Sequence, residues 1–106
     1  EPKAFIVVGG TVPENATVDI DLGISLQSMS LKAVELGLNA LIVRAFDREA
    51  LRVALDLELE PLAVLAIGKG IDNIKLVEVD EGADLKYYRE DGVHFVPKLK
   101  LGDLLV

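Results

Sequence analysis

Two lysines near the C-terminal end have the spacing that most directly suggests chemistry. Lys98 and Lys100 are two positions apart, so in an extended chain both ammonium groups project from one face while Leu99 and Leu101 face the protein. Two such amines can balance a phosphate monoester, whose charge is roughly −2. Pro97 restricts the backbone just before them. A solvated lysine pair is the simpler explanation of the same spacing, so the residues leave both interpretations open.

Glycine pairs occur at the ends of two predicted strands. Gly9-Gly10 leads into Thr-Val-Pro-Glu and not into a helix start, so the dinucleotide-binding fingerprint and the P-loop spacing are both missing. A plain turn is expected there. Gly68-Lys69-Gly70 places an amine between two flexible residues and could approach an anion, although a plain turn is again the simpler interpretation.

Histidine and carboxylate chemistry is not indicated. His94 is the only histidine, the chain has no cysteine, and no partner lies at a spacing typical of a triad or a metal site. A half-exposed structural histidine is expected. Asp80, Glu81 and Asp84 lack the ligand spacing of a calcium loop and are expected to solvate a hairpin tip. We therefore predict no catalytic side chain and no metal ligand.

Composition limits the class of protein. With 106 residues and 51% hydrophobic content, the chain predicts a single domain over residues 1–106. A formal charge of −7 and scattered Lys and Arg argue against nucleic-acid binding. The longest apolar run, residues 62–67, is far shorter than the roughly 20 residues of a membrane helix, so no membrane partner is expected. A cytoplasmic location fits the absence of cysteine best.

Strands and short helices must position these residues. We expect Thr17 or Asp19 to cap a long helix that Gly37 ends, and Asp47 to cap a second helix. The inner face of the second helix would carry Leu51, Ala54 and Leu55. The predicted elements are strand 4–10, loop 11–17, a helix to about residue 36, strand 39–43, helix 48–56, strand 62–67, strands 74–79 and 85–88, and an extended tail over 93–106.

The sequence does not determine the directions of the strands. The crossover rule makes the first three strands parallel by default, but helices of this length can also return the chain to give a mixed sheet. Residues 80–84 are typical of a hairpin loop between strands 74–79 and 85–88, and Asp91-Gly92 predicts a further tight turn.

The long helix has an unusually narrow polar side. Its polar residues form one stripe with steps of four, three, four and three, and nearly everything else on it is apolar. An ordinary surface helix buries only about a 100° sector. This helix therefore predicts a cover on two sides, one from its own sheet and one from a missing segment or a partner subunit. The stripe consists of Asp21, Ser25, Ser28, Lys32 and Glu35.

Five short motifs follow one another along most of the chain: DLGISLQ at 21–27, AVELGL at 33–38, AFDRE at 45–49, LAIGK at 65–69 and VHFVPK at 93–98. Their order and spacing resemble the C-terminal half of the nitroreductase family of FMN-dependent oxidoreductases. The chain also begins Glu1-Pro2, without the Arg-Arg-Ser type segment with which the family's N-terminal half begins. We therefore expect it to be part of a longer protein.

This resemblance implies an α+β fold with a mixed sheet wrapped by helices, and a homodimer with two FMN molecules at the subunit interface. In the family, backbone N–H groups of the segment after the Gly-Leu helix end face N5 and O4 of the isoalloxazine ring. The matching positions here are Ile42, Val43, Arg44 and Ala45. The basic pair that contacts the FMN phosphate in relatives is similar to Lys98 and Lys100.

The implied function is NAD(P)H oxidation by hydride transfer through FMN to a nitroaromatic or quinone-like acceptor, with no side chain needed as acid or base. Relatives often have proline, an acidic residue and glycine where this chain has Ile42, Arg44 and Ala45. The resemblance therefore implies that Arg44 lies near the electron-rich edge of the flavin ring. Two alternatives stay open. One is a flavin-less dimerisation or regulatory module, and the other is a small nucleotide-binding β-α-β domain that uses Gly68-Lys69-Gly70.

Overall fold

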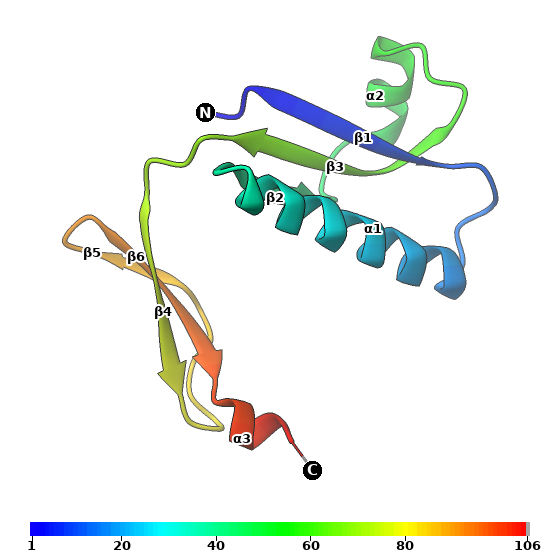
Figure 1. The fold of residues 1–106 in the computed structure, drawn as a ribbon. Coiled ribbons are helices and arrows are strands. Elements are labelled where there is room, and N and C mark those ends of the chain that lie inside the picture. The colour runs from blue at the N-terminus through cyan, green and yellow to red at the C-terminus, as the bar shows by residue number, and fades with distance from the viewer. Residues whose placement is uncertain (106) are drawn as a thin grey trace. The chain divides into compact units, whose positions relative to one another are not determined.

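The structure, a computed structural model, describes residues 1–105. The chain divides into two compact units, Glu1–Gly70 and Ile71–Val106, which we call the N-terminal and C-terminal units and describe separately (Figure 1). The expected α+β class is confirmed, whereas the single domain over residues 1–106 stays a prediction. The elements are β1 Ala4–Gly10, α1 Ala16–Glu35, β2 Asn39–Val43, α2 Arg48–Ala54, β3 Glu60–Gly68, β4 Asn73–Val79, β5 Tyr88–Glu90, β6 Val93–Leu99 and α3 Leu101–Leu104.

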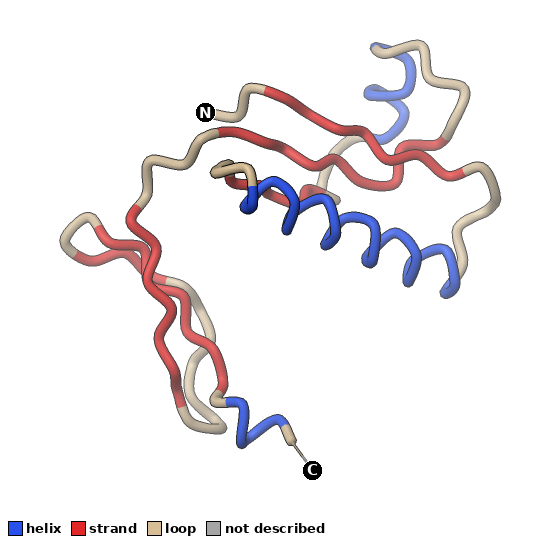
Figure 2. Tube along the Cα trace, viewed as in Figure 1, coloured by secondary structure: helices blue, strands red, loops and turns tan. Residues whose placement is uncertain are grey.

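The N-terminal unit contains a three-stranded sheet in the order β1-β3-β2 (Figure 2). Both outer strands run antiparallel to β3. β1 and β2 therefore run in the same direction as each other, as the crossover through α1 requires. The all-parallel default is wrong for β3, which lies between them in the opposite direction.

The lengths of the two connecting helices explain this topology. α1 has 20 residues and rises about 30 Å, which is enough to carry the chain back along the sheet. α2 has 7 residues and rises only about 10 Å, while β3 with its 9 residues spans about 30 Å. The rise of α2 is less than the length of β2, about 17 Å, and β3 begins where β2 ends.

The two ends of α1 are closed by local contacts. Asn15 is the N-cap, because its side-chain oxygen accepts hydrogen bonds from the amides of Thr17 and Val18. The cap predicted at Thr17 or Asp19 is therefore wrong by a few positions. Gly37 ends the helix as predicted, with φ of 74°. The amides of Gly37 and Leu38 bond back to the carbonyls of Val34 and Ala33, which is the Schellman arrangement.

One side of α1 packs on the sheet. Leu22 and Leu26 are buried against Leu62, Ala63 and Leu65 of β3 and form the core of this unit. The opposite side of the helix is open within the described residues. Its apolar side chains, each 60–62% exposed, are Ile20, Ile24, Leu31 and Val34. The first of the two expected covers is therefore present in this unit.

The second helix differs in part from its prediction. Asp47 caps α2 as expected, since its carboxylate accepts a hydrogen bond from the amide of Ala50. The predicted inner face is only partly correct, because Leu51 is half-buried while Ala54 and Leu55 are exposed. The helix ends at Ala54, and Leu55 leaves the helical repeat as the C-cap.

The C-terminal unit contains a second sheet in the order β4-β6-β5. The predicted hairpin between residues 74–79 and 85–88 is wrong: β4 pairs with β6 in parallel, and β5 pairs with β6 antiparallel. Asp91 and Gly92 have φ of 47° and 76°, which suits a two-residue turn matched to the twist of paired strands. This tight turn, predicted from the sequence, joins β5 to β6.

The tail after β6 is not extended throughout. Residues 101–104 form the short helix α3, and Leu101 is exposed, whereas it was expected to face the protein. Among the described residues, no helix combines the length and apolar character needed to cross a membrane.

Candidate functional site

The segment from Ile42 to Ala45 leaves the sheet at the end of β2. Ile42 and Val43 are the last residues of β2 and pair with β3. Because β2 is at the edge of the β1-β3-β2 sheet, its outer backbone groups have no strand partner within the described residues. The amides of Arg44 and Ala45 likewise donate no hydrogen bond to any residue in the range 1–105. The amides of Arg44 and Ala45, with one of the two amides of Ile42 and Val43, therefore have no acceptor within residues 1–105, because successive N–H groups of an edge strand alternate between its two sides.

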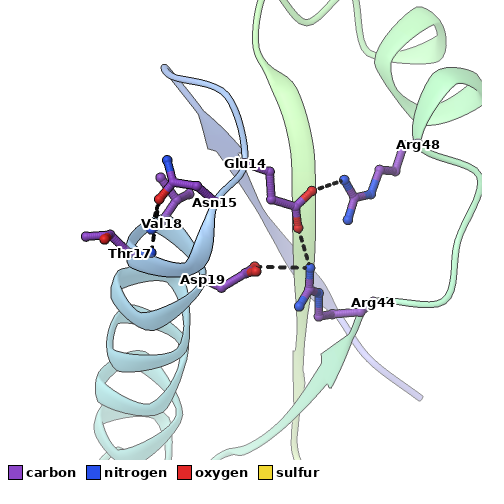
Figure 3. Close-up of polar contacts among 7 residues, drawn as sticks. All are labelled: Glu14, Asn15, Thr17, Val18, Asp19, Arg44 and Arg48. Carbon is purple, nitrogen blue, oxygen red and sulfur yellow. Dashed lines mark hydrogen bonds and ion pairs between the residues drawn. The ribbon is translucent and has the colours of Figure 1, made fainter.

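A cluster of charged side chains lies between this segment and α1 (Figure 3). Nη2 of Arg44 donates to Oε1 of Glu14 at 2.7 Å, and Nη1 of Arg48 donates to Oε2 of the same carboxylate at 2.8 Å. Oδ1 of Asp19 lies 3.5 Å from Nη2 of Arg44. We call these four residues the Glu14 cluster. It connects the loop before α1, the first turn of α1, the end of β2 and the start of α2.

The cluster is electrically balanced. The hydrogen bond from Arg48, together with the charges of Arg48 and Arg44, lowers the pKa of Glu14 below its usual range. The bond from Glu14 raises the pKa of Arg48 in turn. Two carboxylates face two guanidinium groups, so their formal charges cancel. Arg44 is therefore held as an ion-pair partner and its charge is largely offset.

Local sequence patterns do not predict this cluster. Arg44 was singled out for a possible place at a ring edge, and that placement stays a prediction. For Asp19 the sequence predicts a role at the start of the helix, and for Glu14 it predicts none. Glu14 and Arg44 are 30 positions apart in the chain, so no local pattern connects them.

Lys98 and Lys100 belong to the C-terminal unit, whereas residues 42–45 belong to the N-terminal unit. Lys98 is an exposed residue of β6 that pairs in register with Glu78 of β4. Nζ of Lys100 donates a short hydrogen bond to Oδ1 of Asp80, which follows β4. Any anion that binds Lys100 must therefore compete with this carboxylate.

Both glycine pairs have packing explanations. Gly9 and Gly10 lie within β1 and not in the expected turn. A Cβ at Gly9 would lie 2.9 Å from Cβ of Leu59, so this position has no room for a side chain. The amide of Gly70 donates to Oδ1 of Asn39, and a Cβ at Gly70 would lie too close to that oxygen. A pocket of about 240 Å³ near Gly9 and Gly10 is lined in part by Asp21.

His94 lies on β6 with a ring centroid 5.2 Å from that of Tyr87, in a stacked arrangement. The residue is half-buried, as expected, and its Nδ1 is buried without a hydrogen-bond partner in the described part of the chain. Residues 1–105 contain no group of three or more His, Cys, Asp or Glu side chains arranged to hold a metal ion. Stacking on Tyr87 gives His94 a structural role in the β5–β6 hairpin.

Comparison with known protein families places residues 2–69 within the model of the nitroreductase family. The match confirms the resemblance predicted from the sequence, and it includes Ile42, Val43, Arg44 and Ala45 but ends before Lys98 and Lys100. No curated protein matches the chain significantly.

Proposed function

The chain belongs to the nitroreductase family of oxidoreductases, and we propose that it contributes residues 42–45 to an FMN site of an enzyme that oxidises NAD(P)H. The electron acceptor would be a nitroaromatic or quinone-like compound. The observation that carries this proposal is the row of unused amide donors at the end of β2, inside the segment that matches the family.

The donor set at these positions fits the edge of a flavin ring. That edge carries ring nitrogen and carbonyl oxygen acceptors, and the amides of Arg44 and Ala45 are donors with no hydrogen bond to a described residue. Amides in a segment anchored by β2 and by the cap of α2 need little reorganisation to accept such a partner. The chemistry of the donors therefore supports FMN as the cofactor.

FMN, when bound, supplies hydride transfer between the nicotinamide and the acceptor. The contribution of this chain is electrostatic: fixed N–H dipoles at Arg44 and Ala45 would stabilise negative charge that develops on an adjacent acceptor atom. The ion pair with Glu14 holds the guanidinium of Arg44 toward α1. No side chain of the segment is assigned a proton transfer.

Lys98 and Lys100 are proposed, from the family resemblance, as ligands of the FMN phosphate. Ammonium groups form charge-assisted hydrogen bonds with phosphate oxygens. Lys98 supports this role because it forms no ion pair within residues 1–105, whereas Lys100 must exchange Asp80 for the phosphate.

A homodimer is proposed from the open side of α1. Four aliphatic side chains at heptad-like spacing, each about 60% exposed, form an apolar stripe on a helix whose other side is already packed. Contiguous exposed apolar surface of this kind marks an interaction site. A second copy of the same stripe would cover it by helix pairing, since the two stripes are identical and apolar.

An FMN titration tests the cofactor assignment. Ala45→Pro removes one amide donor, whereas the control Ala45→Gly keeps it. Since one hydrogen bond contributes about 1 kcal/mol, we expect the proline variant to bind FMN roughly five-fold more weakly than the glycine variant. Flavin fluorescence gives the affinities, and circular dichroism verifies folding. Failure of the wild-type protein to bind FMN even together with any sequence that precedes residue 1, or equal binding by both variants, contradicts the proposal.

A further inference from the structure

We propose that Glu14 is a positioning residue that holds the segment Arg44–Asp47 in one conformation and offsets the charge of Arg44 at the cofactor. The first half of this inference concerns the chain by itself. The second half rests on the function proposed above. Glu14 touches no substrate in this proposal and acts only through the two arginines.

The carboxylate of Glu14 bridges the two ends of the segment. Its Oε1 accepts from Arg44 at 2.7 Å and its Oε2 accepts from Arg48 at 2.8 Å. The two arginines stand immediately on either side of residues 45–47. One side chain from the loop before α1 therefore fixes both ends of the segment at once.

The segment has few other constraints. The amides of residues 44–47 donate no hydrogen bond within the described chain, and only the carbonyl of Asp47 is used, by the amide of Leu51. Asp19 approaches Arg44 at 3.5 Å without the geometry of a hydrogen bond. Besides the half-buried side chain of Phe46 and the cap at Asp47, the contacts of Arg44 and Arg48 with Glu14 are the main restraints on the segment among the described residues.

Glu49 offers a matched comparison. It also binds an arginine through both carboxylate oxygens, since Arg52 donates to them at 2.8 and 2.9 Å. That pair joins residues three apart within α2, so it restrains only its own helix. The Glu14 pairs join residues 30 and 34 apart and restrain separate elements. The side chain of Glu14 is also less exposed, at 33% against 68% for Glu49.

Glu14 also sets the charge next to the proposed donors. Arg44 directly precedes Ala45, so its positive charge belongs to the same segment as the proposed donors. An uncompensated positive charge beside a flavin favours the reduced, more negative form. Removing the negative charge of Glu14 is therefore expected to raise the reduction potential of bound FMN.

Three variants test the inference: Glu14→Gln removes the charge, Glu14→Asp keeps the charge but is too short to bridge, and Glu49→Gln is the control. We expect the backbone order parameters of residues 44–47, from ¹⁵N relaxation without FMN, to fall from about 0.85 to below about 0.6 in Glu14→Gln. Glu14→Asp should lose order in the same segment, and Glu49→Gln should match the wild type.

The reduction potential of FMN gives the second measurement. It should rise in Glu14→Gln and stay near the wild-type value in Glu14→Asp and Glu49→Gln. Unchanged order parameters in Glu14→Gln overturn the positioning role. Lost order with an unchanged potential overturns the electrostatic role. If the wild type binds no FMN, the proposed function and the electrostatic role both fail, while the order parameters still decide the positioning role.

Discussion

Single side chains decide where α1 begins. Asn15, Thr17 and Asp19 are all good capping residues within five positions, so residue type could not distinguish them. Asn15 has the extended backbone of a cap, with φ of −154°, and its side chain reaches two amides. Asp19 lies inside the first turn, where it approaches Arg44 instead.

Replacing Lys98 and Lys100 is expected to weaken FMN binding. Lys98→Ala with Lys100→Ala removes two ammonium groups, and charge-assisted bonds are stronger than neutral ones, so FMN affinity should fall at least ten-fold. Asp80→Asn should tighten binding, because it frees Lys100 from its carboxylate partner. Fluorescence titration of FMN provides both affinities.

Lys86→Ala is the control, since Lys86 is also an exposed lysine of the C-terminal unit. Equal FMN affinities in the wild type and the double lysine variant would remove Lys98 and Lys100 from the site.

Among the elements, β5 is stabilised by contacts with residues outside the strand. Arg89 on β5 donates two hydrogen bonds to the carboxylate of Asp72, the residue before β4, at 3.0 and 2.8 Å. Tyr88 stacks on Phe95 of the neighbouring strand β6 at 5.0 Å. A strand of three residues is thus anchored by an ion pair and an aromatic pair.

The Asp72–Arg89 pair predicts a pH dependence of stability. The bonds from Arg89 and the nearby charges of Arg89 and His94 lower the pKa of Asp72 from its ordinary value of 3.8. A lowered pKa in the folded state stabilises the protein above the unfolded pKa, and this stabilisation is lost as pH falls through the folded value. The melting temperature of the wild type should therefore exceed that of Asp72→Asn at neutral pH, and the two should converge in acid.

Tyrosine fluorescence follows this transition, because both tyrosines of the chain, Tyr87 and Tyr88, lie in the C-terminal unit. Asp103→Asn removes an acidic residue with no ion pair in the described chain and should give no such difference. A gap between wild type and Asp72→Asn that persists unchanged at low pH would contradict the assigned role of the pair.

For the whole molecule, the main unpaired surface is the outer side of α1, which is open within the described residues. Leu22 and Leu26 are buried on the sheet, while Ile24 and Leu31 remain more than half exposed on the other side. Each aliphatic side chain fully removed from water contributes about 1.5–3 kcal/mol, so covering this stripe would strongly favour association.

Charge placed on the stripe should therefore separate the proposed dimer. Ile24→Glu with Leu31→Glu is expected to shift the protein from dimer to monomer in sedimentation experiments, because buried carboxylates would lack partners. Ser25→Glu on the polar stripe of the same helix is the control and should remain dimeric, because Ser25 is exposed and is not three or four residues from any member of the apolar stripe. A wild-type protein that sediments as a monomer at high concentration would overturn the proposed dimer.

The sequence by itself determined the order of the main elements, the Gly37 helix end, the Asp47 cap, the Asp91-Gly92 turn and the family. These depend on neighbouring residues or on motif order, so they can be predicted without distant contacts. Only the tertiary structure decided that β3 runs antiparallel between β1 and β2, that β4 pairs with β6, and that Glu14 binds Arg44. Such pairings join segments far apart in the chain, and they depend on packing between elements, which local patterns do not encode.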